Sequence, residues 1–143
     1  MSFVLRLEEL RCHDRQEIGG DEIYLKMNGQ EIFSWKAIGK SFTELVNDHR
    51  HTNAFDFRTC SYATPDGWQS TQAYKPQQFV FEDIGSGVSF ELWESDAGNP
   101  LRGADDEFGK LTLVPFAGIP RQQTFRWRTQ GAYYELTCVV TEE

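Results

Sequence analysis

Residues 23–35 have the sequence Ile-Tyr-Leu-Lys-Met-Asn-Gly-Gln-Glu-Ile-Phe-Ser-Trp, and this stretch indicates the fold class. Aliphatic side chains occupy every second position within residues 22–28, which is the pattern of a strand with one buried face. Asn28-Gly29 is the strongest short signal for a two-residue hairpin turn, and residues 31–35 supply the returning strand. The stretch therefore predicts two antiparallel strands.

The same period of two recurs along the rest of the chain and predicts further strands. These cover residues 3–12, 55–60, 78–83, 87–94, 109–116, 124–128 and 132–140. We expect Gly85-Ser86-Gly87 to be a hairpin turn between two of these strands, and Gln130-Gly131 to be another. Eight or nine short strands separated by turn residues predict an all-β fold, a two-sheet antiparallel β-sandwich.

Two segments depart from the strand pattern. Ser41-Phe42-Thr43-Glu44 has the spacing of a capping box, which predicts one short helix over residues 42–49. Residues 61–77 are rich in Ser, Thr, Pro, Asp, Gly and Gln, and we expect a long surface loop there. This loop carries Trp68 and Tyr74, which either form a binding surface or cover the core.

The length of 143 residues predicts a single domain over residues 1–143. No apolar run is long enough for a membrane-spanning helix. The N-terminal sequence lacks the basic and apolar regions of a secretory signal, so we expect a cytoplasmic protein, peripheral at any membrane it binds. Three widely spaced cysteines, Cys12, Cys60 and Cys138, predict reduced thiols that fill the core.

The charge is unevenly distributed along the chain. A net charge of −8 argues against a nucleic-acid partner, because phosphates would repel it. Nine of the 22 acidic residues fall within residues 12–22 and 94–107, two connections between predicted strands. Clustered carboxylates repel one another unless they are solvated or share a cation. Calcium takes six to eight oxygen ligands from flexible loops. The two segments are therefore either a calcium site, with ligands from both loops at one end of the sandwich, or simple solvated turns.

The second acidic segment resembles the third calcium loop of the C-two (C2) domain family, the calcium- and lipid-binding module of protein kinase C and synaptotagmin. The strand Val88-Ser89-Phe90-Glu91-Leu92-Trp93 leads into Glu94-Ser95-Asp96, and Asp106-Glu107-Phe108-Gly109 follows. Glu94, Asp96 and Asp106 take the three acidic places of the family motif. Glu94 replaces an Asp, and Ala97 to Ala104 form an extra stretch.

The first acidic segment is similar to the first calcium loop of the same family. Gly20-Asp21-Glu22-Ile23-Tyr24-Leu25-Lys26 corresponds to Ser-Asp-Pro-Tyr-Val-Lys, without the Pro and with one extra residue. Either Asp21 or Glu22 therefore takes the acidic place. The metal ligands that we predict are Asp14, Asp21, Glu22, Glu94, Asp96, Asp105 and Asp106. Ile18, Leu101 and Arg102 at the loop tips are the predicted contacts to a membrane or partner.

Other polar residues give weaker indications. His13, His49 and His51 lack the spacing of a transition-metal site, and we interpret them as surface residues. Arg126 and Arg128 share one strand face, which is either a solvated face or a surface for anionic groups. We find no nucleophile elbow, phosphate-binding loop or dinucleotide motif, so we do not predict an enzyme.

The sequence therefore predicts calcium-dependent binding of an anionic membrane surface or a protein partner through acidic inter-strand loops. In this mechanism Ca²⁺ cancels the repulsion among the carboxylates and lets anionic groups approach. The first alternative is a metal-independent interaction module of a larger assembly, which docks through its edge strands and aromatic loop. A small hydrolase is the third alternative.

Overall fold

The computed structural model describes residues 2–14, 23–34, 53–64, 67–70, 78–82, 87–94, 105–116, 118–129 and 131–142. This part of the chain is all-β, and its strands pair antiparallel. The strands are β1 (Ser2–Asp14), β2 (Ile23–Met27), β3 (Gln30–Ser34), β4 (Asn53–Asp56), β5 (Ser61–Thr64), β6 (Gly67–Ser70), β7 (Gln78–Glu82), β8 (Val88–Glu94), β9 (Asp106–Leu113), β10 (Gln122–Thr129) and β11 (Ala132–Glu142). The predicted sandwich is confirmed.

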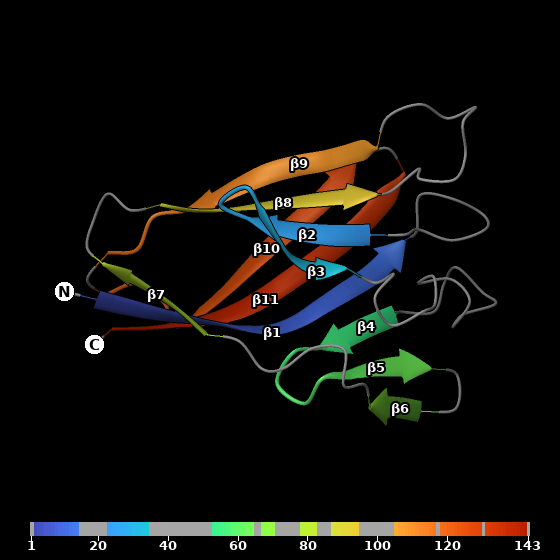
Figure 1. The fold of residues 1–143 in the computed structure, drawn as a ribbon, viewed down its shortest axis with the longest axis horizontal. Helices are drawn as coiled ribbons and strands as arrows, with labels where there is room; N and C mark the ends of the chain where they lie inside the picture. Colours follow the sequence, from blue (N-terminus) through green and yellow to red (C-terminus); the bar gives the residue numbers. More distant parts are fainter. Residues whose placement is uncertain are drawn as a thin grey trace.

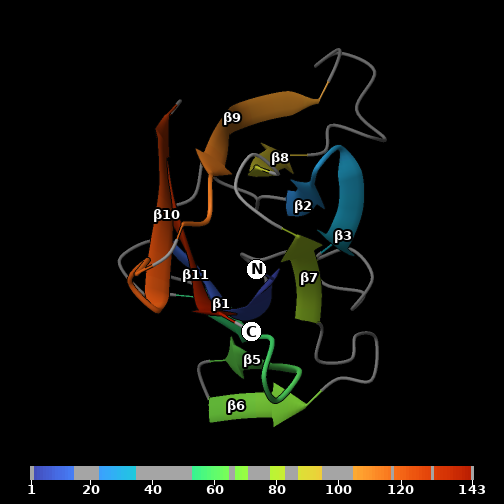
Figure 2. The same cartoon turned by 90° about the vertical axis from the view of Figure 1, so that its left-hand side faces the viewer.

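The strands form two sheets that face one another (Figure 1 and Figure 2). The larger sheet has the order β10-β11-β1-β4-β5-β6, and β7 also pairs with β1. The smaller sheet has the order β3-β2-β8-β9. The long strand β1 holds the larger sheet together, because its first half pairs with β7 and its second half with β4.

Alternation along the strands builds one core between the sheets. In β8, the side chains of Val88, Phe90, Leu92 and Glu94 are buried, and the intervening ones are half-buried. β11 alternates in the same way over Ala132–Val140. Trp127 of β10 is also buried, and its Nε1 donates a hydrogen bond of 3.0 Å to the Gly109 carbonyl of β9. This bond joins the two sheets along one side of the sandwich.

The hairpin predicted at Asn28-Gly29 is confirmed. Both residues have positive φ, 49° at Asn28 and 83° at Gly29, and Met27 pairs with Gln30 across the turn. A two-residue turn of this kind needs left-handed backbone at both positions, which Asn and Gly adopt at least cost. The turn residues therefore set the register of the pairs next to the turn, and an irregularity between Leu25 and Lys26 shifts the register farther along the strands.

The expectation of a loop over residues 61–77 is wrong for its first part. Residues 61–64 and 67–70 form β5 and β6, which extend the larger sheet beyond β4. β5 and β6 pair antiparallel, with Thr64 opposite Gly67, so this part of the segment is a hairpin rather than a loop. The predicted strand over 55–60 ends at Asp56, where the chain turns through residues 57–60. With β5 and β6, the described residues contain eleven strands, compared with the predicted eight or nine.

The expected hairpin at Gly85-Ser86-Gly87 is also wrong. β7 pairs with β1 of the larger sheet, whereas β8 pairs with β2 and β9 of the smaller one. The connection therefore crosses from one sheet to the other. Gly and Ser mark a change of chain direction, but they do not specify which strands pair.

The three cysteines are buried and form no disulfide with one another, as predicted. Burial raises the pKa of the Cys138 thiol to about 12, so it stays protonated. The helix expected over residues 42–49 lies outside the described residues, as do His49, His51 and Tyr74. None of the described residues forms a helix with the length and apolar content needed to span a bilayer.

Candidate functional site at the acidic end of the sandwich

The strands that flank the two acidic segments end at the same end of the sandwich. Ile23, the first residue of β2, lies opposite Glu94, the last residue of β8, and Glu94 lies opposite Asp106, the first residue of β9. Asp14 ends β1 at this same end, on the right in Figure 1. The topology therefore brings together segments that are far apart in the sequence, as the calcium hypothesis requires.

Glu94 is buried rather than presented on a loop. Its side chain is 1% exposed, because the alternation of β8 turns it to the same inner side as Phe90 and Leu92. A buried carboxylate is costly unless polar or charged groups surround it. The fold therefore places the Glu94 carboxylate inside the end of the core.

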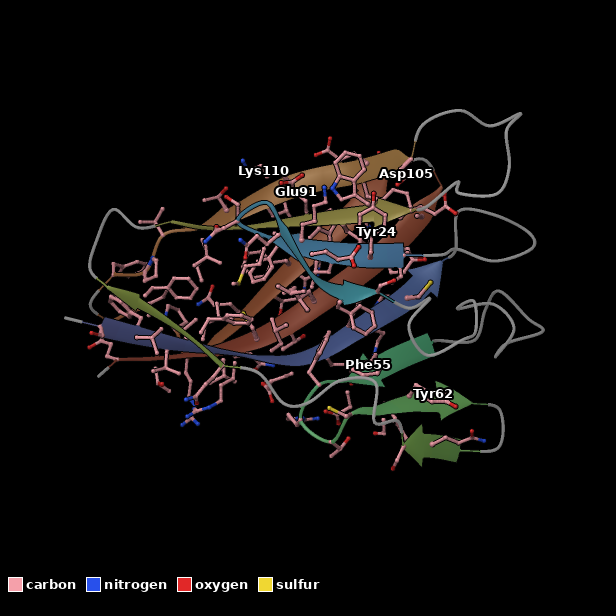
Figure 3. All side chains as sticks on the ribbon, viewed as in Figure 1. Tyr24, Phe55, Tyr62, Glu91, Asp105 and Lys110 are labelled. Carbon is pink, nitrogen blue, oxygen red and sulfur yellow. The ribbon has the colours of Figure 1, made fainter. Side chains whose placement is uncertain are left out.

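Asp105 is held by a tyrosine from another strand. The hydroxyl of Tyr24 on β2 donates a hydrogen bond of 2.6 Å to Oδ2 of Asp105, the residue before β9 (Figure 3). Burial and this carboxylate together raise the pKa of the Tyr24 phenol above its ordinary value. Tyr24 therefore remains a hydrogen-bond donor at neutral pH and orients the Asp105 carboxylate.

Neighbouring side chains contact Tyr24 on the outer face of the smaller sheet. It lies opposite Trp93 in the strand register, and the two rings are nearly parallel with centroids 6.2 Å apart. Lys26 Nζ lies 5.0 Å from the Trp93 ring centroid and 5.9 Å from that of Tyr24. Trp93 Nε1 in turn donates a hydrogen bond of 3.2 Å to Glu91. These contacts restrict the ring that positions Asp105.

The remaining predicted site residues are outside the part of the chain whose side chains the structure describes. Ile18, Asp21, Glu22, Asp96, Leu101 and Arg102 lie outside the described residues altogether. For Asp14 and Asp106, the backbone alone is described. Within the described residues, no three His, Cys, Asp or Glu side chains form a group that would hold a metal ion. Glu94 and Asp105 are therefore the two predicted ligands whose side chains the fold places.

The strand face of Arg126 and Arg128 carries mixed charge. Both arginines are exposed on one face of β10, as predicted, while Phe125 and Trp127 are buried on the other. Glu135 on β11 pairs with Arg126 Nε at 3.3 Å and with Nε2 of His13 at 2.6 Å. Burial alone would raise the pKa of the Glu135 carboxyl, but the Tyr133 hydroxyl, His13 and Arg126 outweigh it and lower that pKa. The Glu135 carboxylate therefore lies between His13 and Arg126, so this face carries an anionic group of its own.

Comparison with known proteins bears on the fold. No family model matches the chain, and no curated protein is similar to it in sequence. A solved structure of a C2 domain matches 98% of this chain and 99% of its own, with a TM-score of 0.50 and 13% sequence identity. The chain has a C2-like fold. A chain in the Cry23Aa1 and Cry37Aa1 binary protein complex aligns over the full length of both chains at a lower TM-score of 0.40 and 18% identity.

The C2-like fold agrees with the resemblance found in the two acidic segments. At 13% identity, the similarity to the solved C2 domain concerns the fold alone. Tyr24 belongs to the stretch that carries this resemblance, yet the sequence did not single it out as a site residue. Its partner Asp105 is 81 positions away. A hydrogen bond across that separation has no local sequence signal.

Removing the Tyr24 hydroxyl tests whether it holds Asp105. We expect Tyr24→Phe to lower the free energy of unfolding by about 1 kcal/mol, the usual net contribution of one hydrogen bond. The aromatic ring and its contact with Trp93 remain in this variant. Urea denaturation measures the effect, with Tyr62→Phe, which removes a 3.1 Å bond to Gln69 in the β5–β6 hairpin, as a matched comparison. Only Tyr24→Phe should alter ligand binding at the acidic end.

Proposed function

We propose that the acidic end of this C2-like sandwich binds Ca²⁺ and, with it, an anionic membrane surface or a protein partner. The convergence of the strand ends carries the proposal. Ile23, Glu94 and Asp106 are neighbours across three strands, and Asp14 ends β1 at the same end. Both acidic connections therefore start and finish within one region.

The proposed action is electrostatic. The chain carries a net charge of −8, so its acidic end repels an anionic surface in the absence of a cation. Carboxylates within reach of one another are hard oxygen ligands of the kind that Ca²⁺ prefers. A bound ion cancels their repulsion and has coordination positions left for phosphate or carboxylate groups of the target. We propose binding rather than catalysis for this site.

The two placed acids have different parts in this proposal. Asp105, whose Oδ2 accepts the bond from Tyr24, is proposed to contribute its carboxylate to the cation site. Glu94 contributes negative charge from within the end of the sandwich. Ile18, Leu101 and Arg102 are proposed to contact the target, with Arg102 meeting a phosphate.

Vesicle co-sedimentation tests the proposal. We expect the protein to pellet with vesicles of phosphatidylserine and phosphatidylcholine in millimolar calcium, and to remain in the supernatant with chelator or with pure phosphatidylcholine. Asp96→Asn and Asp106→Asn should abolish pelleting, because each removes a proposed ligand. Pelleting that is equal in calcium and in chelator contradicts calcium dependence. Absence of pelleting, combined with calcium binding by calorimetry, assigns the site to a protein partner.

The metal-independent interaction module remains the second candidate, because one observation favours it. Trp68 is 52% exposed on β6, a strand whose four residues are all exposed. An exposed aromatic side chain on an edge strand is typical of a protein-binding surface. Vesicle and calorimetric experiments without any response to calcium would favour this candidate.

A further inference from the structure

β10 is the first strand in the order of the larger sheet, and within the described residues no strand pairs with its outer side. Figure 2 shows it at one side of the sandwich, next to β11. Its eight residues pair with β11 without a register shift, from Gln122 opposite Val139 to Thr129 opposite Ala132. An edge strand of this kind has a row of unpaired backbone N–H and C=O groups.

The two arginines of β10 direct their backbone groups to this open edge. Val140 N donates a hydrogen bond of 2.7 Å to the Arg121 carbonyl, just before the start of β10. In an antiparallel ladder, hydrogen-bonded pairs alternate with pairs that share no hydrogen bond. When this alternation continues along the regular register, Arg126 and Arg128 fall in pairs of the second kind. Their N–H and C=O groups therefore point away from β11.

The side chains of both arginines lie on the outer face of the sheet and are incompletely paired. Arg126 has a side chain that is 59% exposed, and its one ion pair within the described residues joins Nε to Glu135 at 3.3 Å. The Arg128 guanidinium lies 4.0 Å from the Tyr133 ring centroid, and no described carboxylate pairs with it. Glu135 also accepts a hydrogen bond from the Tyr133 hydroxyl and contacts His13. The cationic groups of β10 therefore exceed the anion beside them.

Charges alternate along the row of the register that ends at Arg126. Arg11 of β1 lies opposite Glu135 of β11, and Glu135 lies opposite Arg126 of β10. The row is positive, negative and positive across three neighbouring strands, with its last cation at the open edge. Opposite charges directly across two strands stabilise their pairing, whereas like charges destabilise it. The next place in this row, beyond β10, therefore suits an acidic side chain.

We propose that the open edge of β10 binds an extended segment of a partner protein that carries acidic side chains at every second position. The segment adds a strand to the larger sheet, with main-chain hydrogen bonds to Arg126 and Arg128. Its acidic side chains lie beside the two guanidinium groups. Side chains on one face of a strand recur every two residues in both chains, so the spacing of the acids matches that of the arginines.

The other described edges lack this combination. β3 and β7 each carry one acid and no basic residue, β6 carries no charge, and β9 carries acids as well as Lys110. The net charge of −8 repels an acidic segment at long range. At physiological salt, however, exposed charges farther apart than about 8 Å are largely screened. The arginines next to the bound segment then determine which charge is accepted.

A synthetic peptide tests the proposal. We expect a fluorescently labelled peptide of alternating Thr and Glu to bind the full chain saturably in chelator, as measured by fluorescence anisotropy. The same peptide with Lys in place of Glu should not bind. Arg126→Gln and Arg128→Gln should each weaken binding roughly two- to fivefold, the usual effect of one exposed ion pair. Lys110→Gln removes the same charge from an exposed position on β9 and should leave binding unchanged.

Hydrogen exchange distinguishes an added strand from a loose contact between charges. We expect the backbone amides of Arg126 and Arg128 to exchange more slowly when the peptide is bound, because they become hydrogen-bonded. A Thr-Glu peptide with methylated backbone nitrogens keeps its charge but cannot donate main-chain hydrogen bonds. It should therefore bind more weakly than the unmethylated peptide.

Several results would overturn the proposal. One is a Thr-Glu peptide that does not bind at millimolar concentration. Equal weakening by Lys110→Gln and Arg128→Gln would mean that the peptide responds to total charge and not to β10. Binding without slower exchange at Arg126 and Arg128 would exclude an added strand. If phosphatidylserine vesicles bind in chelator through these arginines and the peptide does not, the edge contacts a membrane instead. All of these measurements exclude calcium, so their outcome is independent of the calcium site.

Discussion

Calcium at a hundredfold excess over its dissociation constant is expected to raise the melting temperature of this chain by roughly 5–10 °C. An ion that binds only the folded state adds about 2.7 kcal/mol to the free energy of unfolding at that excess. For a domain of this size, each kcal/mol corresponds to roughly 2–4 °C. The gain is large because folding brings the acidic strand ends at Ile23, Glu94 and Asp106 together, whereas the unfolded chain keeps them apart.

Three variants separate a calcium site from solvated acidic turns. Asp96→Asn and Asp106→Asn should abolish the calcium shift and raise the melting temperature in chelator, since each removes a repelling charge. Asp83→Asn should leave the calcium shift unchanged, because Asp83 follows β7, which ends at the opposite end of the sandwich (Figure 1). Magnesium should act much less, since it requires rigid octahedral geometry. Equal melting temperatures of the wild-type chain in calcium and in chelator would refute the calcium site.

Trp127→Ala is expected to lower the free energy of unfolding by about 3–5 kcal/mol, the usual cost of removing a buried aromatic side chain. Trp127 is 2% exposed and lies in the core between the sheets. Its indole also donates the hydrogen bond to the Gly109 carbonyl that joins β10 to β9. The substitution therefore leaves a cavity and removes a link between the two sheets at the same time.

The same chain provides a matched control for this substitution. Trp68→Ala removes an identical side chain that is 52% exposed, and we expect a change of at most about 0.5 kcal/mol. Urea denaturation measured by circular dichroism gives both values. A comparable loss of unfolding free energy in the two variants would mean that burial of the side chain does not determine the cost of removing it.

The fold class and the main strands follow from local patterns in the sequence. In β8 and β11, apolar residues at every second position specify one buried face, and the structure buries those residues. Asn28-Gly29 determined the β2–β3 hairpin, because few other residues adopt positive φ at both positions. These properties are local, since they depend on neighbours within a few positions along the chain.

The sequence did not determine the partners of each strand. Turn residues between β7 and β8 indicated a hairpin, but the two strands lie in different sheets. β5 and β6 were missed because they are four-residue strands rich in polar residues, and the exposed β6 has no alternation to detect. Pairing between distant segments depends on which apolar faces can be buried together, and that is decided by the whole chain.

The same division applies to the candidate site. The clustering of acids in two segments is a property of the sequence. It predicted that the site lies at the end of the sandwich where these segments meet. Only the tertiary structure placed Glu94 inside the end of the core and brought the Tyr24 hydroxyl to Asp105. Burial and a hydrogen bond between residues 81 positions apart arise when β2, β8 and β9 lie side by side, and no local pattern specifies either.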